Sequence, residues 1–197
     1  MRKSRVTVVL VIIIVSVCGL AGCGSLKNIT INDVAEKIYP VSCTVISEEE
    51  AKKIQDKVPI HLYYATKQNK LKLVVRYIPN TNQDINKIAT IVIEELMKSP
   101  KERELYNVIP KGTKLRKPVR VQDNVAYVDL SEEFINNHKG GKEGEEMTIF
   151  AIVNSLTELK DISRVSFKIN GKVLKEYKGN FRFDKEFPRY IKKVSRI

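Results

Sequence analysis

The sequence predicts an α+β fold, a two-layer sandwich in which two helices pack on one sheet in the order ββα-ββα-ββ. Residues 84–98 and 145–159 carry apolar side chains at helical spacing. Each of these segments is preceded by two strand-like segments, and two more strand-like segments close the pattern. Turn-forming pairs, Asp123-Asn124 and Asn170-Gly171, separate strand-like segments as hairpin turns do.

The first ββα unit is predicted from local composition. Residues 60–64 are β-branched or aromatic, and in residues 71–78 apolar side chains recur at every second position. Asp84 is a suitable N-cap for a helix that runs to about Lys98. Ser99-Pro100 then ends it, because a residue before proline disfavours helical geometry.

The second unit opens with a basic strand. Residues 114–122 alternate apolar side chains with Lys114, Arg116 and Arg120, and residues 125–130 are predicted as the returning strand. A strand would place these three cations on one face. That face is either solvated and protective of a sheet edge, or a docking surface for an acidic partner or an anionic polymer.

The remaining elements follow from caps and turns. Ser131 is predicted to cap a short helix ending near Asn136, and a second long helix covers residues 145–159. Residues 164–169 and 173–177 are predicted as a closing hairpin. Asn154 lies near the apolar stripe of the second helix, and burial would require it to form a hydrogen bond. We expect this bond to tie the helix to a neighbouring loop; contact with a partner is the alternative.

The N-terminus carries an export signal. Basic residues precede an apolar run from Val6 to Val17, and the sequence Leu20-Ala-Gly-Cys23 follows. This pattern resembles the lipobox of bacterial lipoproteins, which implies a signal peptide at residues 1–22 and acylation of Cys23. An ordinary signal peptide with a coincidental cysteine, or an uncleaved anchor, is the alternative. Residues 23–57 are then expected to be a lipidated tether, 58–180 a domain and 181–197 a basic tail.

Charge and location limit the partners. Removal of residues 1–22 takes away three basic residues and leaves 175 residues with a formal charge of +9. A basic protein lipid-anchored at the extracytoplasmic face of the cell membrane suits anionic headgroups or wall polymers. Nucleic acid does not fit that compartment.

No constellation of residues predicts catalysis, a metal or a cofactor. His61 and His138 are far apart in sequence and fit no metal motif. The loop at Gly140-Gly141 leads into three glutamates that would repel a phosphate, and it lacks the lysine of a P-loop. Ser131 stands between a strand and two glutamates, a capping arrangement. We therefore expect a protein that is not an enzyme.

Several motifs, in order, resemble the GerM domain. They are Val108-Ile-Pro-Lys-Gly-Thr113, Val125-Ala-Tyr-Val-Asp-Leu-Ser131 with Phe134, the glycine-rich loop before Glu145, the run from Ile152 to Leu159, and Val165 to Gly171. The resemblance covers about residues 60–176. It contains one such unit, where the family's two-domain form has two.

The resemblance implies a function and a fold. GerM-domain proteins are often secreted lipoproteins linked to sporulation and spore germination, and the domain is similar to ring-building motifs of secretion systems. No catalytic residues are implied. Expected partners are the membrane, envelope or sporulation-complex proteins, and other copies of the chain. The main hypothesis is a membrane-anchored structural or assembly module; the alternative is a lipoprotein that binds or helps to hydrolyse cell-wall material.

Overall fold

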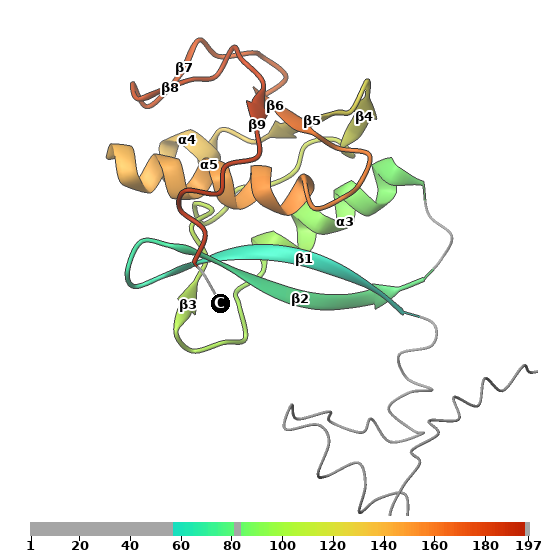
Figure 1. The fold of residues 1–197 in the computed structure, drawn as a ribbon. Coiled ribbons are helices and arrows are strands. Elements are labelled where there is room, and N and C mark those ends of the chain that lie inside the picture. The colour runs from blue at the N-terminus through green and yellow to red at the C-terminus, as the bar shows by residue number, and fades with distance from the viewer. Residues whose placement is uncertain (1–56, 81–83, 196–197) are drawn as a thin grey trace, which may run out of the picture. The chain divides into compact units, whose positions relative to one another are not determined.

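The computed structural model describes residues 57–80 and 84–195 (Figure 1). The predicted signal peptide, Cys23 and all of the predicted tether except Lys57 lie outside the described residues. The described part contains sheets and three helices.

The first sheet is built on a long hairpin. Strands β1 (Lys57–Thr66) and β2 (Leu71–Pro79) pair antiparallel, with Leu62 opposite Val74. The short strand β3 (Leu105–Tyr106) adds to β1, which gives the order β2-β1-β3. Within residues 57–80 and 84–195, strand β2 therefore lies at an edge of this sheet.

Helix α3 (Ile85–Met97) confirms the predicted first helix. The Asp84 side chain accepts a hydrogen bond from the Lys87 backbone N–H and caps the helix. Lys98 leaves the helical conformation just before Ser99-Pro100. The buried face of the helix consists of Ala89, Val92, Ile93 and Leu96.

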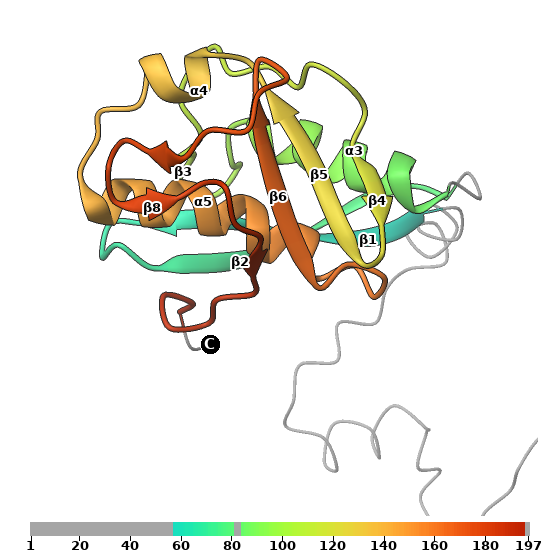
Figure 2. The ribbon, with the colours of Figure 1, turned by 90° about the horizontal axis from the view of Figure 1, so that it is seen from above.

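The second sheet joins the hairpin predicted at Asp123-Asn124 to a parallel pair of strands. Strand β4 (Arg120–Gln122) is antiparallel to β5 (Val125–Leu130), which is parallel to β6 (Arg164–Ile169). Strand β9 (Phe187–Pro188) closes the order β4-β5-β6-β9. Figure 2 shows β5 and β6 side by side, with helices α3 and α5 behind them.

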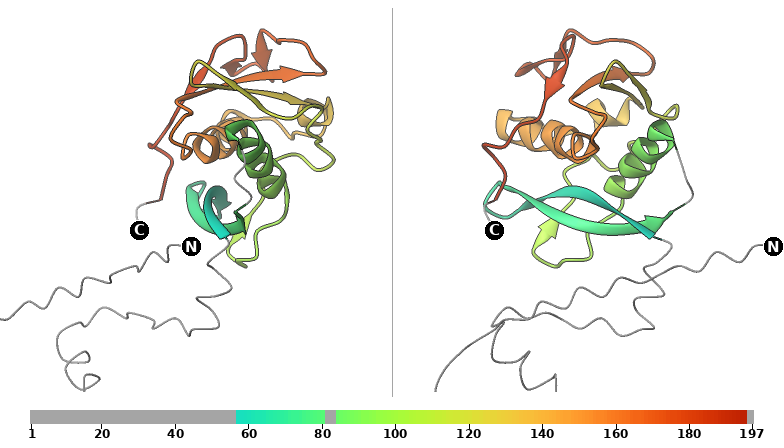
Figure 3. Two further views of the ribbon diagram at one scale, coloured as in Figure 1. Left: turned by 90° about the vertical axis from the view of Figure 1, so that its right-hand side faces the viewer. Right: turned by 45° about the vertical axis from the view of Figure 1, so that its right-hand side comes forward.

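Helix α5 (Lys142–Leu156) is enclosed on several sides. Every residue from Met147 to Leu156 is buried. Figure 3 shows α3 and α5 between the β1–β2 hairpin and the sheet that contains β5 and β6. The prediction of two helices on one sheet is therefore wrong, because β-structure covers both sides of the helical layer. The third helix is the short α4 (Glu133–Asn136).

Two local predictions around α4 are also wrong. The Ser131 hydroxyl accepts a hydrogen bond from the Lys114 N–H at 2.9 Å, and Glu132 occupies the cap position instead. Residues 114–119 do not form a continuous strand: Leu115 makes one isolated bridge to Leu130, and β4 begins only at Arg120. Pro118 lacks the N–H that a continuous ladder would use.

The predicted closing hairpin forms only at its turn. Ile169 and Lys172 exchange backbone hydrogen bonds across Asn170-Gly171. The chain then leaves the sheet, and β7 (Glu176–Tyr177) pairs with β8 (Phe181–Arg182). The place beside β6 is taken by β9, which comes later in the chain.

The segment after residue 180 belongs to the core of the fold. Phe183 and Phe187 are buried, and the Phe183 ring stacks on Phe167 with centroids 4.9 Å apart. Asn154 exchanges two hydrogen bonds with the backbone of Tyr190, which confirms the expected tie to a neighbouring segment. The domain boundary placed at residue 180 thus coincides with no boundary in the structure.

Candidate functional site

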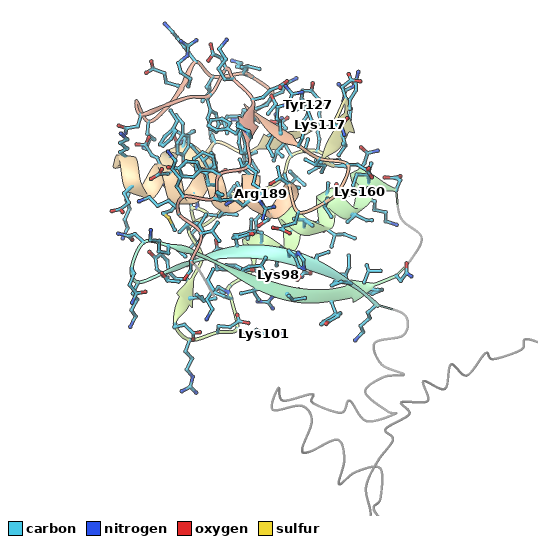
Figure 4. The ribbon with its side chains drawn as sticks, in the orientation of Figure 1. Lys98, Lys101, Lys117, Tyr127, Lys160 and Arg189 are labelled. Atoms are coloured by element: carbon cyan, nitrogen blue, oxygen red, sulfur yellow. The ribbon has the colours of Figure 1, made fainter. Side chains whose placement is uncertain are left out.

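A basic groove lies on the outer face of the second sheet. It has a volume of about 290 Å³. We name it the basic groove; it is lined by Lys117, Pro118, Arg120, Tyr127, Val128, Asp129, Lys168 and Gly171. Figure 4 shows Lys117 and Tyr127 together at this side of the molecule.

Strand register brings the groove residues together. Arg120 lies opposite Tyr127 in the β4–β5 pair, and Asp129 lies opposite Lys168 in the β5–β6 pair. Alternate residues of a strand share a face, so Tyr127 and Asp129 both point outward while Ala126, Val128 and Leu130 fill the core. A hairpin and a strand distant from it in sequence thus contribute to one surface.

Arg120 and Tyr127 form the centre of the groove. The guanidinium carbon of Arg120 lies 5.3 Å from the centroid of the Tyr127 ring, which is cation–π geometry. Holding the guanidinium against the ring limits its motion while its N–H groups remain available to an acceptor. Tyrosine and arginine are among the residue types that most often supply binding energy at protein interfaces.

Asp129 has a structural role in the groove wall. Its Oδ1 accepts a hydrogen bond from the Gly171 N–H at 2.9 Å, and its Oδ2 lies 3.5 Å from Nη1 of Arg116. The carboxylate therefore ties the 170–171 turn to the segment before β4. Because both oxygens have partners, Asp129 is poorly placed to act as a general base.

The three cations expected to share one face are in three different settings. Arg120 lines the groove, whereas Arg116 is at its border through the ion pair with Asp129. Lys114 is exposed but is not part of the groove lining. It lies near Glu133, whose pKa is lowered by hydrogen bonding from Ser131 and its own backbone, with a smaller effect of the Lys114 charge.

Sequence reasoning missed Tyr127 and Lys168 as site residues. Tyr127 was assigned only to a strand, although its alternation with buried neighbours indicates an outward side chain. Lys168 joins the site through the parallel pairing of β5 and β6, which no local pattern indicates. Among the cations of the groove lining, Arg120 is the one that the sequence analysis names.

The charge of the groove favours an acidic ligand. Its lining has three cations and one carboxylate, a net formal charge of +2. An arginine with free N–H groups can bind a carboxylate through two parallel hydrogen bonds, and lysines add long-range attraction. The arrangement is chemically suited to docking an acidic surface.

A second polar cluster surrounds His138. The ring Nδ1 accepts a hydrogen bond from the Gly140 N–H at 2.8 Å, and Nε2 lies 3.1 Å from the Thr148 hydroxyl. Thr148 in turn donates to the Val108 carbonyl. Burial lowers the pKa of His138, and the acceptor role of Nδ1 is one that the neutral ring can take and the protonated ring cannot. The cluster joins the glycine loop to the start of helix α5.

Neither a metal cluster nor a membrane-spanning helix is found in the part of the chain that the structure describes. Among residues 57–80 and 84–195, no group of three histidine, cysteine, aspartate or glutamate side chains is arranged to hold a metal ion. The helices within these same ranges are also too short or too polar to cross a bilayer.

Two solved structures from Bacillus subtilis share this fold. The tandem GerMN domains of the sporulation protein GerM are 21% identical, with a TM-score of 0.56 over 72% of this chain. The first GerMN domain of that protein is 24% identical, with a TM-score of 0.52 over 67% of this chain. This chain spans 48% of the tandem structure and 97% of the first domain alone.

Sequence comparison leads to the family. No curated protein matches the chain. The model of the Germane family, described as sporulation and spore germination, matches residues 61–175. This range contains the basic groove, the His138 cluster and the motifs that suggested the GerM domain. The chain therefore belongs to the Germane family of sporulation and spore germination proteins.

Proposed function

We propose that this protein is a lipid-anchored, non-enzymatic module that holds an acidic partner protein at the outer face of the cell membrane during sporulation or germination. The observation that carries the proposal is the basic groove, in which Arg120 is held on Tyr127 beside Lys117 and Lys168. The family match supports the process, and the lipobox-like sequence ending at Cys23 supports the anchor.

Docking explains the groove better than catalysis does. The acid in its lining, Asp129, already has partners on both oxygens. The cations that line it offer donors and positive charge, which suit recognition of an acidic surface. The affinity for a ligand held in this way should fall when the salt concentration is raised, because exposed charges are screened.

A role in sporulation or germination can be tested by deleting the gene for this protein in the organism that carries it. We expect the deletion strain to form fewer heat-resistant spores, or to form spores that lose optical density more slowly after a germinant is added. Restoration by the wild-type gene is the control. Normal spore numbers and normal germination would refute a role in both processes.

The anchor can be tested separately. A Cys23→Ala variant should lose its lipid, leave the membrane fraction and fail to restore the deletion strain, because acyl chains contribute about 0.8 kcal/mol per buried CH₂ group. Retention of the variant in the membrane fraction, with full restoration of the deletion strain, would show that another feature localises the protein. Release from the membrane fraction with full restoration would show that anchoring is dispensable.

A further inference from the structure

One edge of strand β2, which we call the free edge because no strand among the described residues covers it, is a second surface that does not involve the basic groove. Strand β2 ends the sheet order β2-β1-β3, so one side of its backbone faces away from β1. Leu71 already uses this side: its N–H donates to the Lys193 carbonyl, and its carbonyl accepts from the Ser195 N–H, both at 2.8 Å. The edge is therefore able to form strand-like hydrogen bonds.

Every second residue of β2 presents its backbone N–H and carbonyl groups away from β1. In an antiparallel ladder, residues alternate between bonding with the partner strand and facing away from it. Leu73, Val75 and Tyr77 therefore present their N–H and carbonyl groups in the direction that Leu71 does. The side chains of Val75 and Tyr77 are 44% and 54% exposed, so an apolar surface accompanies this edge.

A cleft lies beside the edge, on the opposite face of the strand. It has a volume of about 620 Å³ and is bounded by residues 75–79 on one side. The end of α3 and the segment after it form the other side, with Glu95, Lys98, Ser99, Lys101 and Glu102. Figure 4 shows Lys98 and Lys101 close to the strands of this sheet.

Arg76 is incompletely paired in the cleft wall. Its guanidinium carbon lies 5.9 Å from the Tyr64 ring centroid, and its Nη2 lies 4.0 Å from Oε2 of Glu102, beyond hydrogen-bond distance. Nε and Nη2 of Arg76 and Oε2 of Glu102 are buried, and none has a hydrogen-bond partner among the described residues. Nε and Nη2 are neighbouring donors on one side of the guanidinium, the geometry that a carboxylate can bind with both oxygens.

We propose that the free edge of β2 binds an extended acidic segment of a partner protein by strand addition, with one carboxylate of that segment replacing Glu102 at Arg76. Strand addition uses backbone hydrogen bonds for affinity and alternate side chains for specificity. Here one set of side chains packs on Val75 and Tyr77, and the other enters the cleft. The occupant is therefore a segment that alternates apolar and acidic residues.

Charge opposes the pairing of two copies of β2 in the register centred on Val74. Lys72 and Arg76 lie on one face of the strand, four residues apart. An antiparallel pair of two β2 strands centred near Val74 would place Lys72 of one copy opposite Arg76 of the other. Like charges directly opposite each other destabilise a pair of strands.

Hydrogen exchange of the full-length chain tests the proposal directly. The probe is a synthetic hexapeptide of alternating valine and glutamate, and its lysine counterpart is the control peptide. The glutamate peptide should slow amide exchange at Leu73, Val75 and Tyr77. The affinity for the lysine peptide should be lower by a factor of about ten or more. Unchanged exchange at these three amides, or equal affinity for both peptides, would overturn the proposal.

Two variants of the edge separate backbone from side-chain recognition. Val75→Pro removes an outward N–H without removing a bond to β1, so it should abolish peptide binding. Val75→Ala keeps the N–H and should retain most of the affinity. Equal binding by both variants would refute strand addition. If Val75→Pro unfolds at a lower temperature than the wild type, peptide binding by the Arg76 and Glu102 variants tests the proposal instead.

Variants of Arg76 and Glu102 should change the affinity for the glutamate peptide in opposite directions. Arg76→Gln should weaken binding of the glutamate peptide about tenfold, because a charge-assisted pair is lost. Glu102→Gln should strengthen binding, since it removes the carboxylate that competes for Arg76. Lys160→Gln, at an exposed lysine that lines neither the basic groove nor the cleft, should leave binding unchanged. Weaker binding by Glu102→Gln, loss of binding by Lys160→Gln, or edge protection that grows with protein concentration without peptide would each contradict the proposal.

Discussion

The Tyr63 hydroxyl donates a hydrogen bond of 2.7 Å to Oε1 of Glu158 and so joins strand β1 to the segment after helix α5. Glu158 also pairs with Nδ1 of His61 at 2.9 Å and with the Arg189 guanidinium. Burial, and then the hydrogen bond to Glu158, raise the pKa of Tyr63 to about 12. For Glu158, burial favours the neutral form, but its hydrogen bonds with His61, Tyr63 and Arg189 outweigh it and lower the pKa.

Loss of the Glu158 carboxylate should destabilise the protein. Glu158→Ala removes the acceptor for Tyr63 and Arg189, and we expect the free energy of unfolding in urea to fall by about 1–3 kcal/mol. Glu176→Ala, at an exposed carboxylate in β7, is the matched control and should change it by less than about 0.5 kcal/mol. Equal stability of the two variants would show that Glu158 does not hold these segments together.

The His138 cluster makes stability depend on pH. Burial lowers the pKa of His138 in the folded chain below the value of about 6.5 in the unfolded chain. The unfolded chain therefore binds more protons between these two pKa values. The contribution of His138 is fully present above about pH 6.5 and is lost as pH falls through that window.

A variant isolates this effect. His138→Gln should reduce the slope of unfolding free energy against pH between about pH 7.5 and pH 5, because the titrating group is gone. The measurement is urea denaturation of both proteins at several pH values. A slope that is unchanged in the variant would assign the pH dependence to other groups.

A side chain at Gly171 is expected to destabilise the fold. Its φ is +77°, and an added Cβ would lie 3.3 Å from Nη1 of Arg116, the side chain paired with Asp129. Gly171→Ala should therefore lower the unfolding free energy by about 1–2 kcal/mol. Gly179→Ala is the control, because Gly179 also has a positive φ, +96°, but nothing lies within 4 Å of an added Cβ. A cost no greater than that of Gly179→Ala would show that the contact with Arg116 is unimportant.

Phe183 tests whether the segment after residue 180 is part of the core. Its side chain is 1% exposed and stacks on Phe167. Phe183→Ala should lower the unfolding free energy by about 3–5 kcal/mol, the usual cost of emptying an aromatic core position. Val173→Ala, at a 54% exposed side chain, should have little effect. A small effect of Phe183→Ala on the unfolding free energy would show that this segment contributes little to the stability of the core.

Elements with strong local signals were predictable. Helix α3 was found because Asp84, the apolar stripe and Ser99-Pro100 all act within the helix itself. Helix α5 was placed three residues late at both ends, since burial of every residue from Met147 to Leu156 removes the polar face that marks a helix in sequence. The two-residue strands β7, β8 and β9 are too short to show any period.

The site was predictable only in part, for a related reason. Arg120 could be recognised because its charge alternates with the apolar residues around it. The parallel pairing of β5 with β6, which brings Lys168 to the groove, joins segments about 40 residues apart and has no local signature. The placing of Lys114 depended on a continuous strand that Pro118 prevents.

The central claim is that the basic groove is the surface through which this protein acts. The most direct measurement is the number of heat-resistant spores, with the germination rate of those spores, in the deletion strain carrying an Arg120→Glu, Lys168→Glu double variant. Lys160→Glu, at an exposed lysine outside the groove, is the matched control. We predict that the double variant is folded and membrane-bound but behaves like the deletion, whereas the control behaves like wild type. Full restoration by the double variant would contradict the claim.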